Sequence, residues 1–418
     1  MVASEDSGML SPYRVLDLTD ERGILCGKIL ADLGADVIQI EPAGGSSARR
    51  VGPFYHDEAH PERSLFWWAY AANKRSITLN LAMRDGQALL KRLVSSAHFL
   101  VESFEPGYIA SLGLDYEVLA ALNPALIVVS ITPFGQDGPY ARYKAPDVIG
   151  MGMAGFMYLT GDPDRPPVRV SVPHFYLQGA AAGATGAMIA HIQRLASGQG
   201  QHVDVSCQEA VARTLANAPQ SYALENTVIR RQGSYRQTGG TTFMRITWPC
   251  QDGFINFQLS GGAGAGRSVN NLIQWMDEEG MGDPFLQGLN WTELGYGTIT
   301  KELLERVVPP IERFFMSHTK AELFEGAVKR RILLFPVATA GDILQNPQLQ
   351  ARGYFRQMTY AELGTTVAYP GPFVRASAVP MNLRRLPPKI GEHNAEVYLD
   401  ELGLRPEELV RLHEAGVV

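Results

Sequence analysis

Short apolar runs alternate with amphipathic segments along the first half of the chain. The runs occupy residues 13–18, 35–41, 77–81 and 126–131, and a helical segment is predicted at 84–96. Continuous apolar runs of this length are typical of parallel strands that are buried on both faces. Because such strands alternate with helices, the pattern predicts an α/β fold with a parallel, Rossmann-like sheet.

The pattern changes near residue 235. Two apolar runs, 247–250 and 254–259, flank a turn of sequence QDG. Asp-Gly favours tight turns, so this arrangement predicts a β-hairpin. Helices are predicted at 269–278 and 301–317. This part of the chain therefore indicates a smaller α+β domain that ends near residue 340.

A central stretch at residues 167–205 joins the two patterns. It predicts a strand at 168–172, a turn at Pro173, a helix rich in Ala and Gly, and a second strand of sequence HVDVS. A helix of small residues allows another backbone to approach closely. A strand that leads into a helix start is also where α/β proteins place nucleophiles and bind anions. Composition alone favours the simpler interpretation, a buried crossover helix packed on the sheet.

Composition and charge narrow the function classes. The 418 residues carry a formal net charge of −6, which argues against non-specific binding of nucleic acid. Cys26, Cys207 and Cys250 lie far apart without metal-ligand spacing, so neither a disulfide framework nor a metal site is expected. The sequence shows neither an apolar run near the roughly 20 residues of a membrane helix nor a signal-peptide pattern. We therefore expect a cytoplasmic protein.

Motifs in a fixed order give the chain a family resemblance. They are VLDLT at 15–19, LGADVI at 33–38, NKRS at 73–76, ESFEPG at 102–107, GQDGPY at 135–140 and GEH at 391–393. Each motif alone is weak, but together and in this order they resemble the family III CoA-transferases (CaiB/BaiF type). The resemblance spans nearly the whole chain.

The resemblance implies a particular architecture. Each protomer of the family is an open ring with a Rossmann-like large domain, built from both chain ends, and a smaller α+β domain. Two protomers interlock like chain links. For this chain the implied domains are 1–220 for the first part of the large domain, 235–340 for the small domain, and 341–418 for the linker and the return to the large domain.

The family's nucleophile is the feature that this chain lacks. In the family, an Asp near the start of the small-residue helix carries the acyl group as a mixed anhydride. Counting forward from Arg169 and back from the SGQGQ sequence at 197–201 places Tyr176 at that position. Between Arg169 and His202 the sequence contains no carboxylate. The resemblance therefore implies a non-catalytic subunit of a heteromer whose homologous partner supplies the Asp.

The implied reaction moves CoA from succinyl-CoA to a dicarboxylate such as (R)-benzylsuccinate, in the branch of the family that serves anaerobic toluene degradation. The CoA thioester is a substrate, and no cofactor is expected. The positions that hold CoA in the family correspond here to Arg22, Asn73, Lys74, Arg75, Ser103 and Phe104.

The individual CoA positions differ in their chemistry. Arg75 can pair with a phosphate and Phe104 can flank the adenine, although a structural salt bridge is the open alternative for Arg75. Asp20 and Glu21 beside Arg22 would repel a polyphosphate, so this loop departs from a good CoA site.

Two other functions remain open from the sequence. The chain could be a stand-alone racemase or lyase that uses His174 and Tyr176, or a scaffold that binds CoA thioesters. A phenol has a pKa near 10, which makes it a poor acyl carrier at neutral pH, so we expect Tyr176 to fill space. Gly239 and Gly240 match the family's mobile glycine loop in position better than the GGAGAG sequence at 261–266 does.

Overall fold

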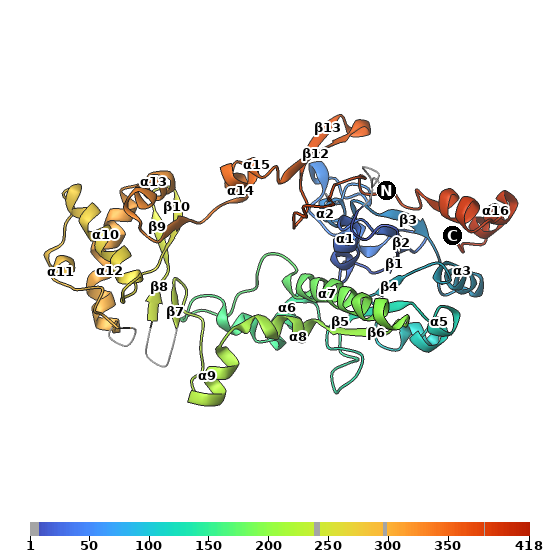
Figure 1. Ribbon diagram of the computed structural model, residues 1–418, viewed down its shortest axis with the longest axis horizontal. Helices are drawn as coiled ribbons and strands as arrows, with labels where there is room; N and C mark the ends of the chain where they lie inside the picture. The colour runs from blue at the N-terminus through green and yellow to red at the C-terminus, as the bar shows by residue number, and fades with distance from the viewer. Residues whose placement is uncertain (1–7, 238–242, 296–298, 380) are drawn as a thin grey trace. The chain divides into compact units, whose positions relative to one another are not determined.

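The computed structural model describes residues 8–237, 243–295, 299–379 and 381–418 (Figure 1). The chain forms two compact units. The first contains the residues up to 154 together with 170–214 and 347–418, and the second contains 155–169 and 215–346. The segment 155–169 joins the second unit, which a domain boundary at residue 220 does not anticipate.

A six-stranded parallel sheet forms the centre of the first unit, in the order β3–β2–β1–β4–β5–β6. The strands are β1 (Arg14–Leu18), β2 (Asp36–Glu41), β3 (Arg75–Thr78), β4 (Phe99–Glu102), β5 (Ile127–Thr132) and β6 (His202–Ser206). Val15 of β1 pairs with Val37 on one side and with Phe99 on the other, so the strand order reverses between β1 and β4. The predicted α/β class is confirmed. Sheets of this kind open a crevice at such a reversal, beyond the carboxyl ends of their strands.

Helices cover both faces of the sheet. They include α3 (Arg84–Val94), α5 (Tyr116–Leu122) and α16 (Pro406–Glu414) on one face, and α1 (Ile24–Asp32) and α7 (His174–Ser197) on the other (Figure 1). Alternate side chains of a strand point to opposite faces. Leu16, Ile38 and Leu100 are accordingly buried with residues of α3, α5 and α16. Ile131 points the other way and meets α7.

The small residues of α7 have a packing cause. A Cβ atom built at Gly179 would lie 2.2 Å from Sγ of Cys207, the first residue of α8 (Cys207–Ala212). A Cβ atom at Gly183 would lie 2.9 Å from Cδ1 of Ile131. Larger residues would force α7 away from the sheet and from α8. The interpretation as a buried crossover helix is therefore correct.

The strand predicted at 168–172 is wrong. These residues form no regular secondary structure, and Val168 and Val172 are 48% and 49% exposed. An apolar run becomes a strand only where a neighbouring strand accepts its backbone hydrogen bonds. Helix α7 instead begins directly after Pro173, where the N–H of Phe175 donates to Oδ1 of Asp147 at 2.9 Å.

The second unit has the predicted α+β character. Its antiparallel sheet contains β9 (Thr247–Cys250), β10 (Gly253–Phe257) and β11 (Leu334–Pro336), and its helices include α10 (Ala265–Glu278), α12 (Lys301–Met316) and α13 (Lys320–Arg330). Gly253 pairs with Cys250, which confirms the hairpin. Trp248, Phe257 and Phe315 form its aromatic centre, with ring centroids 5.4–6.1 Å apart.

The C-terminal part of the chain completes the first unit. The hairpin of β12 (Phe355–Tyr360) and β13 (Thr365–Pro370) packs on α2 (Leu65–Ala71). Beyond it, the backbone N–H of His393 donates to the carbonyl of Ser76 at 2.9 Å, and the N–H of Thr78 donates to Oδ1 of Asn394 at 2.9 Å. The outer edge of β3 is thereby covered. Among the described residues, no helix combines the length and the apolar character of a membrane span.

A buried carboxyl group ends β4, next to the reversal of strand order. Glu102 is 2% exposed, and its Oε2 accepts the N–H of Phe104 at 2.7 Å. Burial is the main cause that raises the pKa of Glu102 to about 7, and the negative charge of Asp204 also raises it. Hydrogen bonds from Ser130 and the Phe104 N–H, and the charge of Arg22, lower the pKa in part. The carboxyl group thus holds the turn that leads into Phe104, and it takes up a proton near neutral pH.

We predict that Glu102 makes the fold more stable in mild acid than in base. The folded-state pKa lies above the unfolded value, so this contribution is present below about pH 4.5 and is lost as the pH rises through about 7. In the native chain, ionisation of Glu102 should lower the free energy of unfolding between pH 5 and pH 8.5. Glu102→Gln cannot ionise, so in this variant the decrease should be smaller by roughly 1 to 3 kcal/mol. Urea unfolding at both pH values measures it. Glu414→Gln on the exposed end of α16 is the control, and equal pH dependence in the two variants would contradict the assignment.

Candidate active site

A crevice of about 300 Å³ opens at the carboxyl ends of the first four strands. Leu18 of β1, Glu41 of β2 and Ser103 after β4 all line it, so it lies where the strand order reverses. Phe104 and Asp20 complete this wall. The structure therefore brings Ser103 and Phe104 together at the position that the fold favours for a ligand, and their contact with CoA stays a prediction.

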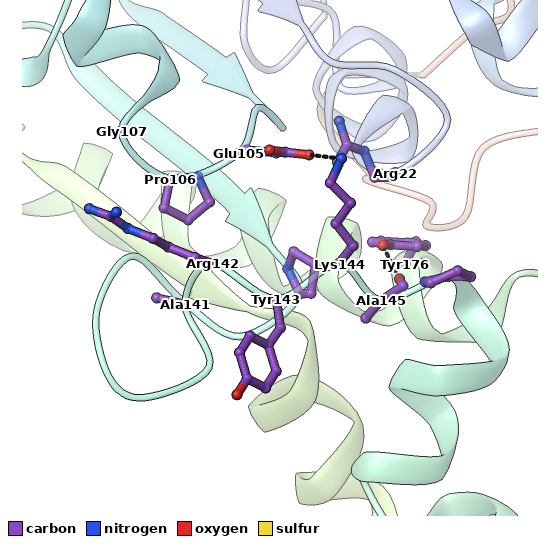
Figure 2. Close-up of a pocket in the computed structure, with 12 residues that line it drawn as sticks. Arg22, Glu105, Pro106, Gly107, Ala141, Arg142, Tyr143, Lys144, Ala145 and Tyr176 are labelled. Carbon is purple, nitrogen blue, oxygen red and sulfur yellow. Dashed lines mark hydrogen bonds and ion pairs between the residues drawn. The ribbon is translucent and has the colours of Figure 1, made fainter.

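A second cavity of about 490 Å³ contains Tyr176 (Figure 2). Arg22, Glu105 and the segment 141–146 line it with Tyr176. The segment follows the GQDGPY motif, and its Arg142 and Lys144 were not singled out from the sequence. Their signal was available, since a loop after the carboxyl end of β5 reaches the same edge of the sheet.

Tyr176 is locked in the first turn of α7. Its ring is 9% exposed, and its hydroxyl donates to the carbonyl oxygen of Ala145 (Figure 2). Burial raises the pKa of this phenol, and Arg22 opposes the rise only in part. The group is therefore neutral at physiological pH, with its proton committed to a carbonyl. It is neither a nucleophile nor a proton acceptor in this arrangement.

The cavity of Tyr176 has a single carboxylate among the described residues that line it. This carboxylate belongs to Glu105. Its side chain is 62% exposed and pairs with Nζ of Lys144 at 3.2 Å (Figure 2). His174 lies two residues before Tyr176 on α7, and side chains at that spacing do not face each other. Its Nε2 lies 3.4 Å from Nε2 of Gln178. The geometry does not support His174 and Tyr176 as a catalytic pair.

Arg22 is bound within its own loop. Its Nε and Nη2 lie 2.7–3.0 Å from the carboxylate of Asp20, and that carboxylate also accepts the hydroxyl of Ser103 at 3.0 Å. This loop contributes to both cavities, because Asp20 lines the smaller one and Arg22 lines the larger one.

The side chain of Lys74 has a structural role in this fold. It is fully buried, and its ammonium donates to Oδ2 of Asp17, the carbonyl of Ile24 and Oε1 of Gln39 at 2.7–2.9 Å. A lysine has three donors, and all three are used. These bonds favour the structural role for Lys74, and its contact with CoA stays a prediction.

Arg75 and Asn73 hold distant segments of the first unit together. The guanidinium of Arg75 contacts Asp36, Glu396 and Glu401 at 2.6–2.9 Å, which is the salt bridge left open by the sequence. Oδ1 of Asn73 accepts the N–H groups of Arg384 and Arg385 at 2.6 and 3.1 Å. These contacts give both side chains of the NKRS motif a role in folding, and their contact with CoA stays a prediction.

Metal ligands and the glycine loop complete the search. The described part of the chain contains no group of three or more His, Cys, Asp or Glu residues that could hold a metal ion. Gly239 and Gly240 lie outside the described residues. Gly261 and Gly266 pack against Leu294 and Trp291 in their own unit, so their small size serves packing there.

Comparison with known proteins agrees with this architecture. The chain is 35% identical to the succinyl-CoA:(R)-benzylsuccinate CoA-transferase subunit BbsE of Thauera aromatica, over 98% of each chain. It is 28% identical to the succinyl-CoA–L-malate CoA-transferase beta subunit of Chloroflexus aurantiacus, over 98% of each chain. The crystal structure of a CAIB/BAIF family protein from Brucella suis matches with a TM-score of 0.77 and 27% identity, over 94% of this chain and 99% of that one.

The model of CoA-transferase family III matches residues 10–394, which include all the residues that line the two cavities. The chain belongs to CoA-transferase family III.

Proposed function

We propose that this chain is the subunit without the nucleophile in a heteromeric family III CoA-transferase. The observation that carries the proposal is Tyr176, a neutral, buried phenol bonded to the carbonyl of Ala145 at the position of the family's catalytic Asp. An acyl carrier must present a nucleophilic atom to the thioester, and this side chain presents none. A homologous partner subunit that carries the Asp would then perform the covalent chemistry.

The reaction that fits is transfer of CoA from succinyl-CoA to a dicarboxylate. The partner's Asp attacks the thioester carbonyl, the CoA thiolate leaves, and a mixed anhydride forms. The acyl group and CoA are then exchanged through covalent intermediates until CoA is joined to the second acid and the Asp is free again. Two relatives named as subunits support both the heteromer and succinyl-CoA as donor. (R)-Benzylsuccinate is the acceptor that we propose.

The role of this subunit would then be structural and local. It would complete an interlocked ring dimer and contribute one wall of the acyl pocket. Arg142 and Lys144 line the cavity beside Tyr176, and cations there suit the free carboxylate of a dicarboxylate. The homologous catalytic subunit is its expected partner, the CoA thioester is the substrate of the complex, and the proposal requires no cofactor.

We predict that chemical trapping labels only the partner. Hydroxylamine converts an acyl-aspartyl anhydride into a hydroxamate, so the complex purified after co-expression is incubated with succinyl-CoA and hydroxylamine. Intact-mass analysis should show the adduct on the partner and an unmodified mass for this chain. An adduct mapped by peptide analysis to any Asp or Glu of this chain would show that it is itself catalytic.

Replacing the phenol tests whether Tyr176 only fills space. Tyr176→Phe keeps the ring and loses one hydrogen bond, so turnover of the complex should stay within about threefold. A proton donor or acceptor at this position would cost about a hundredfold or more. Tyr143→Phe, which removes an exposed phenol from the same cavity, is the matched control. A hundredfold loss in Tyr176→Phe alone would favour the stand-alone enzyme.

A further inference from the structure

The loop after β1 is tied to its neighbours by two carboxylates. Asp20 accepts hydrogen bonds from the Arg22 backbone N–H at 3.0 Å, from the Arg22 guanidinium at 2.7–3.0 Å and from the Ser103 hydroxyl at 3.0 Å. Glu21 accepts the hydroxyl of Ser47, which lies after β2. The loop therefore spans the crevice from the β4 side to the β2 side.

The ion pair between Asp20 and Arg22 joins one residue of each cavity. Asp20 lines the crevice of about 300 Å³ with Ser103, and Arg22 lines the cavity of about 490 Å³ with Tyr176. Both side chains are 26% exposed, so solvent or a ligand can reach them.

The chemistry of the pair opposes a phosphate ligand in two ways. A guanidinium binds phosphate through the same forked donors that here bind a carboxylate, so the donors are already occupied. The carboxylate of Asp20 also repels a phosphate that approaches Arg22. Glu21 contributes only the second effect, because its contact is with the hydroxyl of Ser47.

We infer that Asp20 is the residue that prevents this subunit from binding CoA, because it occupies the guanidinium of Arg22, which lines the cavity of Tyr176. The inference rests on the proposed function, since it concerns the subunit of the heteromer that lacks the nucleophile. Without the nucleophile, this subunit cannot carry the acyl group, whereas the Asp20–Arg22 pair prevents it from binding CoA.

The test compares two variants that each remove one negative charge from the loop. Asp20→Asn keeps a side-chain oxygen for the Arg22 N–H but releases the guanidinium, whereas Glu21→Gln leaves the ion pair intact. CoA is titrated by calorimetry into the full chain, purified with the subunit that co-purifies. Asp20→Asn should add one CoA-binding site for each copy of this chain. The affinity of CoA for this site should be at least about fivefold higher than in the native chain. Glu21→Gln should change the affinity by less than twofold.

Two further variants make the result specific. Asp20→Asn combined with Arg22→Gln should lose the gained sites, because the released guanidinium is absent. Asp20→Ser, which retains a hydroxyl oxygen for the turn, should reproduce the gain and guards against a folding defect in Asp20→Asn. An equal gain in Glu21→Gln, or no gain in both Asp20 variants, would overturn the inference. Hydroxamate labelling tests catalysis separately, so it can fail while the CoA titration succeeds.

Discussion

The reversal of strand order between β1 and β4 is the constraint on which the site depends. Consecutive parallel strands on either side of it send their connections in opposite directions, so the loops after β1 and β4 separate and leave a crevice. Asp20 and Ser103 come from these two loops and meet across it. The loop after β5 and the first turn of α7 add the second cavity at the same edge. One topological feature thus brings together segments that are more than 150 residues apart in this chain.

Within that frame, chemistry is determined by single side chains. Tyr176 lies at a helix start that is packed closely through Gly179 and Gly183, next to a cavity. Its phenol lies on the same face of α7 as these two glycines and is neutral, with its hydroxyl bonded to the carbonyl of Ala145. The fold therefore does not by itself determine the chemistry of this position, which depends on the side chain that the sequence places there.

The sequence was most informative where local pattern decides the structure. Continuous apolar runs identified the buried strands, because such strands have no polar face, and a QDG turn identified the hairpin of β9 and β10. The run at 168–172 was mispredicted because its strand character depends on a pairing partner that the fold does not provide. The same dependence on distant partners limits the prediction of the CoA-binding role of Arg75. Its partners Glu396 and Glu401 lie more than 300 residues away, so a local motif could not distinguish a salt bridge from a phosphate contact.

The cover over β3 has a consequence for the life of the chain. The residues that satisfy the outer backbone groups of this strand, His393 and Asn394, follow it by more than 300 residues along the chain. Until they leave the ribosome, the parallel sheet has an unpaired edge that another nascent chain could extend. The first unit therefore remains open to misassembly while these intervening residues are synthesised, and its edge closes only after residue 394 has emerged.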